Sequence, residues 1–287
     1  MEYGLYVEGD SFGKAWKKLN HEAFTGEPEH VSSNAHYFNC MMKITNPHIE
    51  DVNLGYIGYT KSKFTNLINL YWLEENAQEF IARLHYYKNI KPKGKDYVVS
   101  LALNFDTRMN RTGACLQYLS IGQSPEQGWV VFVRTRANEI AQRLYADMVF
   151  VHLILKKICA EVDIPFEKLT IYWTIDAVYQ SVIGCNLWLA MTYGESVIKG
   201  FMDRPVEQMT KWQKRVRDRY LKNFNLDKED RKVYNYAVQQ RATYNFDRIL
   251  EDEIEMVDMQ ELYDKLPGLD LNQEVYDDLF GRKGGGR

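Results

Sequence analysis

The segment WVVFVRTRANEIAQRLYADMVFVHLILKKICAEV, residues 129–162, contains the clearest secondary-structure pattern in this chain. Its first part, Trp129–Thr135, is an apolar, β-rich run, and the part from Ile140 to Val162 has the length and spacing of a long helix. From Met148 to Leu155 this helix is apolar nearly all round, so we expect it to be central and buried. A β-rich run followed by a buried helix predicts a sheet that carries helices on a face.

The neighbouring segments extend this plan in both directions. Periodicity predicts further strands at Tyr37–Thr45, Val52–Tyr59, Tyr97–Phe105, Cys115–Ile121 and Leu169–Thr174, and helices at Ser11–Thr25, Phe64–Lys88 and Asp176–Tyr193. This order predicts an α+β fold, in which a mostly antiparallel sheet packs against a few long helices. No segment has the composition of a linker, so we expect a single domain over residues 1–287. Residues 203–265 are interpreted as a charged helical segment and residues 266–287 as a loose tail.

Composition and charge exclude several classes of protein. The chain has 36 basic and 39 acidic side chains and a formal net charge of −3, which argues against direct electrostatic binding of nucleic acid. It has no apolar run of membrane-spanning length and no signal-peptide pattern, so we expect a cytoplasmic protein without a membrane partner. The histidines and cysteines lack the spacing of metal ligands, and no metal site is predicted. The cysteines are expected to be free thiols: Cys40, Cys115, Cys159 and Cys185.

Cys115 and Asp147 are the first candidates for chemistry. Cys115 opens an apolar strand downstream of Arg108 and Arg111, and nearby cations favour a reactive thiolate. The alternative for Cys115 is a small core residue. Asp147 interrupts an otherwise apolar helix, where a carboxylate must be paired or must meet a polar ligand. The alternative for Asp147 is a position on the solvent-facing side near the helix start.

A second set of candidates follows the strand WVVFV. Arg134, Thr135 and Arg136 combine two guanidinium groups with a hydroxyl, a combination suited to capturing a phosphate or carboxylate. The alternative is a pair of solvated arginines beside a turn.

Taken together, residues 97–179 resemble the thymidylate synthase family, which includes the pyrimidine nucleotide hydroxymethylases. The resemblance rests on ACLQYLSIG with Cys115, VFVRTRANE with Arg134 or Arg136, the helix position of Asp147, and YWTIDAVYQ with Asp176 and Tyr179. A weaker similarity covers GDSFGKAW to YFNCMMKIT and the helix that contains LINLYWL.

The resemblance implies a thymidylate-synthase-like fold and a one-carbon transferase. The thiolate of Cys115 would add to C6 of a pyrimidine nucleoside monophosphate, and 5,10-methylenetetrahydrofolate would supply the one-carbon unit. The resemblance further implies a homodimer, with Arg108 and Arg111 as candidates to reach across the interface. The residues implied to bind substrate are Arg134, Thr135, Arg136, Asp176, Tyr179 and the same two arginines, Arg108 and Arg111.

Two positions refine what the resemblance implies. The synthases have asparagine where this chain has Asp147, whereas the dCMP hydroxymethylases have aspartate, so Asp147 favours hydroxymethylation of (d)CMP. In LINLYWL, Asn69 stands where the family has its catalytic glutamate, and Trp72 matches a cofactor-contacting position. The alternatives that remain open are a dUMP C5-methyltransferase and a catalytically silent nucleotide-binding or interaction protein on the same fold.

Overall fold

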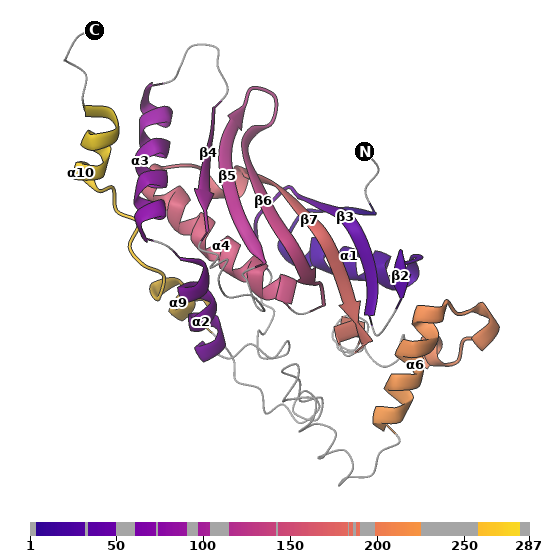
Figure 1. Cartoon of the computed structure of the whole chain (residues 1–287). Coiled ribbons are helices and arrows are strands. Elements are labelled where there is room, and N and C mark those ends of the chain that lie inside the picture. Colours follow the sequence, from indigo (N-terminus) through magenta and orange to yellow (C-terminus); the bar gives the residue numbers. More distant parts are fainter. Residues whose placement is uncertain are drawn as a thin grey trace.

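The computed structural model describes residues 4–31, 34–49, 61–72, 74–90, 97–103, 115–141, 143–182, 184–185, 188–189, 199–224 and 258–281. Its strands form one sheet in the order β1-β3-β7-β6-β5-β4, with β2 paired to β3 (Figure 1). The strands are β1 (Leu5–Gly9), β2 (His30–Val31), β3 (Asn34–Ile44), β4 (Tyr97–Ala102), β5 (Leu116–Ser124), β6 (Gly128–Glu139) and β7 (Thr170–Ser181). The β1–β3 and β6–β7 pairs are parallel and the other pairs are antiparallel. The predicted mixed fold with a mostly antiparallel sheet is confirmed.

Helices α1 and α4 lie behind the sheet in the view of Figure 1 and bury its inner face. Ser11 caps α1, because its hydroxyl oxygen accepts a 3.1 Å hydrogen bond from the backbone N–H of Lys14. Helix α4 is buried along nearly its whole length, as its apolar sequence predicts. The helices are α1 (Phe12–Thr25), α2 (Lys61–Tyr71), α3 (Glu74–Ile90), α4 (Arg143–Val162), α6 (Lys211–Phe224), α9 (Met259–Asp264) and α10 (Gln273–Tyr276).

A kink runs across three neighbouring strands and decides which residues face the helices. In β3, β6 and β7 the alternation of buried residues reverses at Asn39, Arg136 and Asp176. These positions are skipped in the otherwise continuous pairing of the strands. Asn39 has a φ of 54°, a left-handed conformation that asparagine tolerates better than most residues. Beyond the kink Asn138 and Val178 are buried on the inner face.

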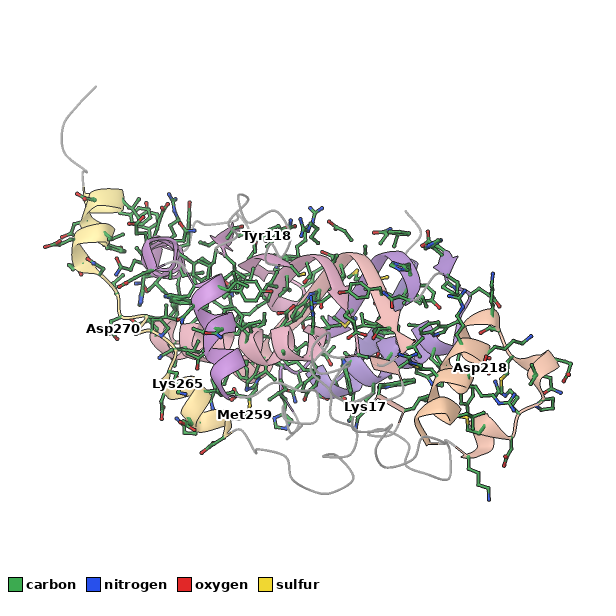
Figure 2. The ribbon with its side chains drawn as sticks, turned by 60° about the horizontal axis from the view of Figure 1, so that its bottom comes forward. Lys17, Tyr118, Asp218, Met259, Lys265 and Asp270 are labelled. Atoms are coloured by element: carbon green, nitrogen blue, oxygen red, sulfur yellow. The ribbon has the colours of Figure 1, made fainter. Side chains whose placement is uncertain are left out.

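The outer face of the sheet carries exposed apolar side chains and is not covered by any helix among the described residues. Figure 2 shows Tyr118 of β5 on the side of the molecule opposite to Lys17 of α1. The ring of Phe132 stacks on that of Tyr172 across β6 and β7, with 5.7 Å between ring centroids. We call this surface the open face, defined by Tyr6, Phe38, Val98, Phe132 and Tyr172.

Two helices predicted from the sequence differ from the structure. The predicted helix Phe64–Lys88 is two helices, because α2 ends at Tyr71 and α3 begins at Glu74. The helix predicted from Asp176 was wrong over its first residues. Strand β7 continues to Ser181, because Val178 and Gln180 pack with a period of two against the core. The predicted strand Val52–Tyr59 lies outside the described residues.

The C-terminal prediction was partly wrong as well. Residues 266–281, expected to belong to a loose tail, are packed where the structure describes them. Leu266 and Leu269 are buried, and the ring of Phe280 stacks on Tyr86 of α3 at 3.8 Å between centroids. Apolar side chains hold this segment although it contains Pro267 and Gly268. Within the charged segment 203–265, α6 and α9 are helical as expected, and residues 225–257 lie outside the described residues.

Candidate functional site

Asp147 lies inside the molecule, not on a solvent-facing side of α4. The residue is 3% exposed, and both of its carboxylate oxygens accept hydrogen bonds. The Nδ2 of Asn138 donates to Oδ2 at 2.6 Å, and the hydroxyl of Tyr71 donates to Oδ1 at 3.1 Å. Burial raises the pKa of Asp147 to about 7, although both donors and the nearby charge of Arg143 oppose the rise. The carboxyl group can therefore exchange a proton near neutral pH.

Cys115 immediately precedes β5, and backbone hydrogen bonds of Cys115 and Leu116 hold it in place. The backbone N–H of Arg136 donates to the carbonyl oxygen of Cys115 at 2.9 Å. The backbone N–H of Leu116 donates to the hydroxyl oxygen of Tyr71 at 3.4 Å. The pairing of β5 with β6 shifts register between Leu116 and Tyr118, and such irregularities redirect side chains at the end of a strand. Cys115 is half-buried, whereas the other three cysteines are buried.

The thiol of Cys115 lies in the electrostatic field of several neighbouring groups. Burial raises its pKa above the ordinary value, and the negative charge of Asp147 raises it further. The guanidinium groups of Arg143 and Arg136 oppose this rise. Tyr179 belongs to the same environment, since its pKa is raised by burial and by Glu139 and Cys115 and lowered by Arg143. The structure therefore brings together four of the residues singled out in the sequence: Cys115, Asp147, Arg136 and Tyr179.

Three other candidates have partners elsewhere. Arg134 and Asp176 form an ion pair with 3.2 Å between Nη2 and Oδ2, and both side chains are about half exposed. Thr135 is fully buried, and its hydroxyl oxygen accepts a 2.7 Å hydrogen bond from Nε1 of Trp173. Thr135 therefore anchors the core side of β6, while Arg134 and Asp176 join β6 to β7 at the surface.

Helix α2 contributes Tyr71 to the site, whereas the sequence pointed to Asn69 on the same helix. Asn69 is exposed, whereas Tyr71 at the end of the helix is 3% exposed and reaches Asp147. Trp72 is half-buried, and its Nε1 is buried without a hydrogen-bond partner among the residues that the structure describes. Arg108 and Arg111 lie outside the described residues.

Sequence reasoning missed Tyr71, Asn138 and Arg143 as members of this site. Arg143 carried a weak signal, because it lies four residues before Asp147 and shares a helix face with it. Asn138 carried none, since a regular strand through Arg136 would give its side chain the same orientation as that of the exposed Arg136. The reversal of alternation at the kink turns Asn138 inward to Asp147.

The described residues form neither a metal site nor a membrane-spanning helix. Among the described residues, no group of three or more histidine, cysteine, aspartate or glutamate side chains could hold a metal ion. None of the described helices combines the length and the hydropathy needed to cross a membrane.

No protein-family model and no curated protein matches the sequence. Among solved structures, the chain is similar to the crystal structure of thymidylate synthase from T4 phage, with a TM-score of 0.40 and 9% sequence identity. The match covers 76% of this chain and 93% of the other. An overlap at this level identifies neither a family nor an activity.

Proposed function

We propose that this chain modifies C5 of a pyrimidine nucleoside monophosphate and acts on (d)CMP as a hydroxymethylase. The observation that carries the proposal is the convergence of the half-buried thiol of Cys115 with the buried carboxyl group of Asp147 and the guanidinium groups of Arg136 and Arg143. A thiol, a proton-exchanging carboxyl group and an anion-binding pair are the groups that addition to a phosphorylated pyrimidine requires.

Cys115 would act as the nucleophile. Its Sγ adds to C6 of the ring, the electron pair of the C5–C6 double bond moves onto the ring, and C5 becomes a carbon nucleophile. Once C5 has bonded to the new carbon, C5 loses its proton to solvent, water supplies the hydroxyl oxygen, and the thiolate leaves C6 as the C5–C6 double bond returns. Because the pKa of Cys115 is raised in the free protein, the thiol must lose a proton on the way to addition. Asp147, with a pKa of about 7, is our candidate to accept it.

Arg136 and Arg143 would bind the 5′-phosphate. Both side chains are exposed, and both act on the thiol of Cys115 by lowering its pKa. A guanidinium pair suits bidentate binding of a phosphate. Arg134 and Asp176 would reach substrate only if their ion pair opens.

Asp147 would also recognise the base. Its oxygens accept one described hydrogen bond each, and a carboxylate oxygen can accept two. The remaining acceptor positions suit the 4-amino group of cytosine, which donates hydrogen bonds. Uracil has O4 at that place, and an ionised carboxylate and O4 are both acceptors, so they cannot form a hydrogen bond. Tyr179, half-buried near Cys115, would border the nucleotide.

The one-carbon donor would be 5,10-methylenetetrahydrofolate, which supplies a carbon at the oxidation level of formaldehyde when bound. The fit rests on Trp72, whose buried Nε1 has no partner in the described structure and can donate to a polar group of a ligand. Its indole ring, half-buried at the end of α2, offers a surface on which a flat heterocycle stacks. Asn69 is exposed on the same helix and has no assigned role in this arrangement.

We further propose that the protein is a cytoplasmic homodimer that pairs through the open face. Phe38 and Tyr6 are each 46% exposed there, and Val98 is 57% exposed. The same face carries the Arg134–Asp176 ion pair, and a sheet face that combines exposed apolar side chains with charged groups suits an interface with another protein. A second copy would cover it with the same surface, as in most two-fold assemblies. Arg108 and Arg111 remain the candidates to reach across this interface.

Two observations favour alternatives. A pKa of about 7 leaves Asp147 partly protonated near neutral pH, and a protonated carboxyl group donates to O4 of uracil, which favours dUMP as substrate of a C5-methyltransferase. The raised pKa of Cys115 favours a catalytically silent nucleotide-binding protein.

The test is release of tritium from C5-labelled dCMP, CMP and dUMP, with and without 5,10-methylenetetrahydrofolate. The proposal expects release from a cytosine nucleotide by the wild type and none by Cys115→Ser. Cys159→Ser is the matched control, because Cys159 is buried in α4 and should leave release intact. Release from dUMP alone would favour the methyltransferase. Nucleotide binding without release would favour the silent nucleotide-binding protein. Absence of binding would contradict both enzymes and leave the interaction protein.

A further inference from the structure

We propose that Tyr71 is a positioning residue, and that its hydroxyl couples the charge of Asp147 to the strand start that carries Cys115. The inference rests on the proposed function only for the identity of Cys115 as the reacting group. It assigns to Tyr71, and not to Asn69, the contribution of helix α2 to the site. One hydroxyl group, that of Tyr71, lies between two elements that are distant in sequence.

The hydroxyl of Tyr71 makes two hydrogen bonds in opposite senses. It donates to Oδ1 of Asp147 on α4 at 3.1 Å, and it accepts from the backbone N–H of Leu116 on β5 at 3.4 Å. A tyrosine hydroxyl has one proton to donate, so these bonds use that proton and one acceptor position. Three elements therefore meet at one oxygen atom: α2, α4 and the start of β5.

Packing fixes the ring that carries this hydroxyl. Tyr71 is 3% exposed and tilts against Phe150 of α4, with 5.3 Å between ring centroids. Packing alone would be satisfied by phenylalanine. A buried hydroxyl costs free energy unless its hydrogen bonds are made, so the two polar contacts are what tyrosine adds at this position.

The direction of the hydrogen bonds links them to the charge of Asp147. When Asp147 is ionised, it accepts the proton of Tyr71, and the Tyr71 oxygen is polarised toward the N–H of Leu116. When Asp147 is protonated, its oxygen is a weaker acceptor and this chain of hydrogen bonds loosens. The strand position next to Cys115 is therefore held most firmly when Asp147 carries a negative charge.

Other charged and titratable groups act on the same site and have to be considered with the pair. They come from the neighbouring elements and are Arg143 on α4, Arg136 and Glu139 on β6, Tyr179 on β7 and Cys115 itself. Arg143 lowers the pKa of both Asp147 and Cys115. It does not replace the hydroxyl of Tyr71, which joins Asp147 to the backbone next to Cys115.

The experiment measures the rate at which iodoacetamide alkylates Cys115 in the full chain as a function of pH. In the wild type we expect the profile to contain, besides ionisation of the thiol, an inflection at the pKa of Asp147, about 7. Tyr71→Phe removes one donor to the carboxylate, so this inflection should move to higher pH by about one unit. Alkylation needs no nucleotide, so a failure of the tritium assay does not affect this result.

Three comparisons make the test specific. Asn66→Ala changes an exposed residue of the same helix and should leave the profile unchanged. Asn69→Ala should also leave the inflection in place, and a shift there would return the role to Asn69. In an Asp147→Asn background, Tyr71→Phe should no longer move the profile. An unmoved inflection in Tyr71→Phe, or a shift that persists without the Asp147 carboxylate, would overturn the proposal.

A measurement on the wild type covers the case in which Tyr71→Phe does not fold. The ¹³C resonance of the Tyr71 ring carbon that bears the hydroxyl should titrate with the same midpoint as the Asp147 carboxyl carbon. A Tyr71 resonance that stays constant while Asp147 titrates would equally overturn the coupling.

Discussion

The Nδ2 of Asn138 donates a 2.6 Å hydrogen bond to Oδ2 of Asp147 and joins strand β6 to helix α4 across the core. Asn138→Ala removes that donor and leaves the buried carboxyl group with the hydroxyl of Tyr71. We expect the free energy of unfolding to fall by about 1–3 kcal/mol, the cost of leaving a buried polar group unsatisfied. The loss should be larger above the Asp147 pKa of about 7, because the ionised form needs the donor more.

Urea denaturation on both sides of that pKa measures the effect of Asn138→Ala. Gln127→Ala is the control, since it removes the side-chain oxygen that accepts a hydrogen bond from the hydroxyl of Tyr172 at the surface. A loss of equal size at both pH values would show that Asn138 does not support the ionised carboxylate.

The buried carboxyl group of Asp147 should make the stability of the protein depend on pH. Its folded pKa of about 7 lies above the ordinary value of 3.8, so the folded state holds a proton that the unfolded state releases between these values. The contribution of Asp147 to the free energy of unfolding is fully present below its pKa in the unfolded state. It is lost as the pH rises through its pKa in the folded state. By linkage the loss amounts to about 4 kcal/mol over this window.

Asp147→Asn removes this titration, so the stability of the variant relative to wild type should increase from about pH 4 to about pH 7 and then stay constant. The difference between the two proteins is the quantity to measure. Burial lowers the pKa of His152 to about 4, and that histidine contributes the opposite slope in both proteins. A difference that does not change with pH would mean that Asp147 is ionised throughout.

Cys115 should be the first of the four cysteines to react with a thiol reagent in the folded protein. It is half-buried, whereas Cys40 and Cys159 are buried and their pKa values are raised by burial to about 12. Limited alkylation followed by peptide mass spectrometry should place the first label on Cys115. Cys115→Ser should slow labelling of the folded protein sharply, and Cys159→Ser should not. Equal labelling of Cys40 and Cys115 would contradict the prediction.

Much of the fold follows from patterns that a single sequence contains. The alternation in WVVFVRT and the apolar helix around Met148–Leu155 predict a strand and a buried helix, and the structure has β6 and α4 there. The sequence also singled out Cys115 and Asp147, because a cysteine at a strand entrance and an acid in an apolar helix are unusual in themselves.

What could not be predicted depends on contacts between distant segments. Residues 176–181 have enough apolar spacing for either a helix or a strand, and pairing of β7 with β3 and β6 decides for the strand. Asn138 faces inward only because neighbouring strands kink together. Tyr71 is the last residue of α2 and belongs to the site. The end of this helix before Glu74 could not be predicted, because no proline or glycine occurs between Tyr71 and Glu74.

The C-terminal segment should contribute to stability, although its composition resembles that of a tail. Leu262 of α9 is fully buried, so Leu262→Ala should lower the free energy of unfolding by about 2–5 kcal/mol through lost burial and the cavity it leaves. Leu279→Ala, at a residue that is 36% exposed, is the matched control and should cost much less. Thermal and urea unfolding measure both variants. Equal, small effects would mean that the segment is not docked in solution.

The open face gives the last prediction, which concerns assembly. If a second copy covers this face, Phe132→Lys should place a charge in the interface and shift the protein from dimer to monomer in sedimentation velocity. Val206→Lys is the matched control, because Val206 and Phe132 are both 41% exposed and Val206 belongs to the short helix Val206–Gln208, not to a strand of the sheet. Circular dichroism should show that both variants keep the fold. A wild type that sediments as a monomer at all concentrations, or a Phe132→Lys variant that remains dimeric, would contradict pairing through the open face.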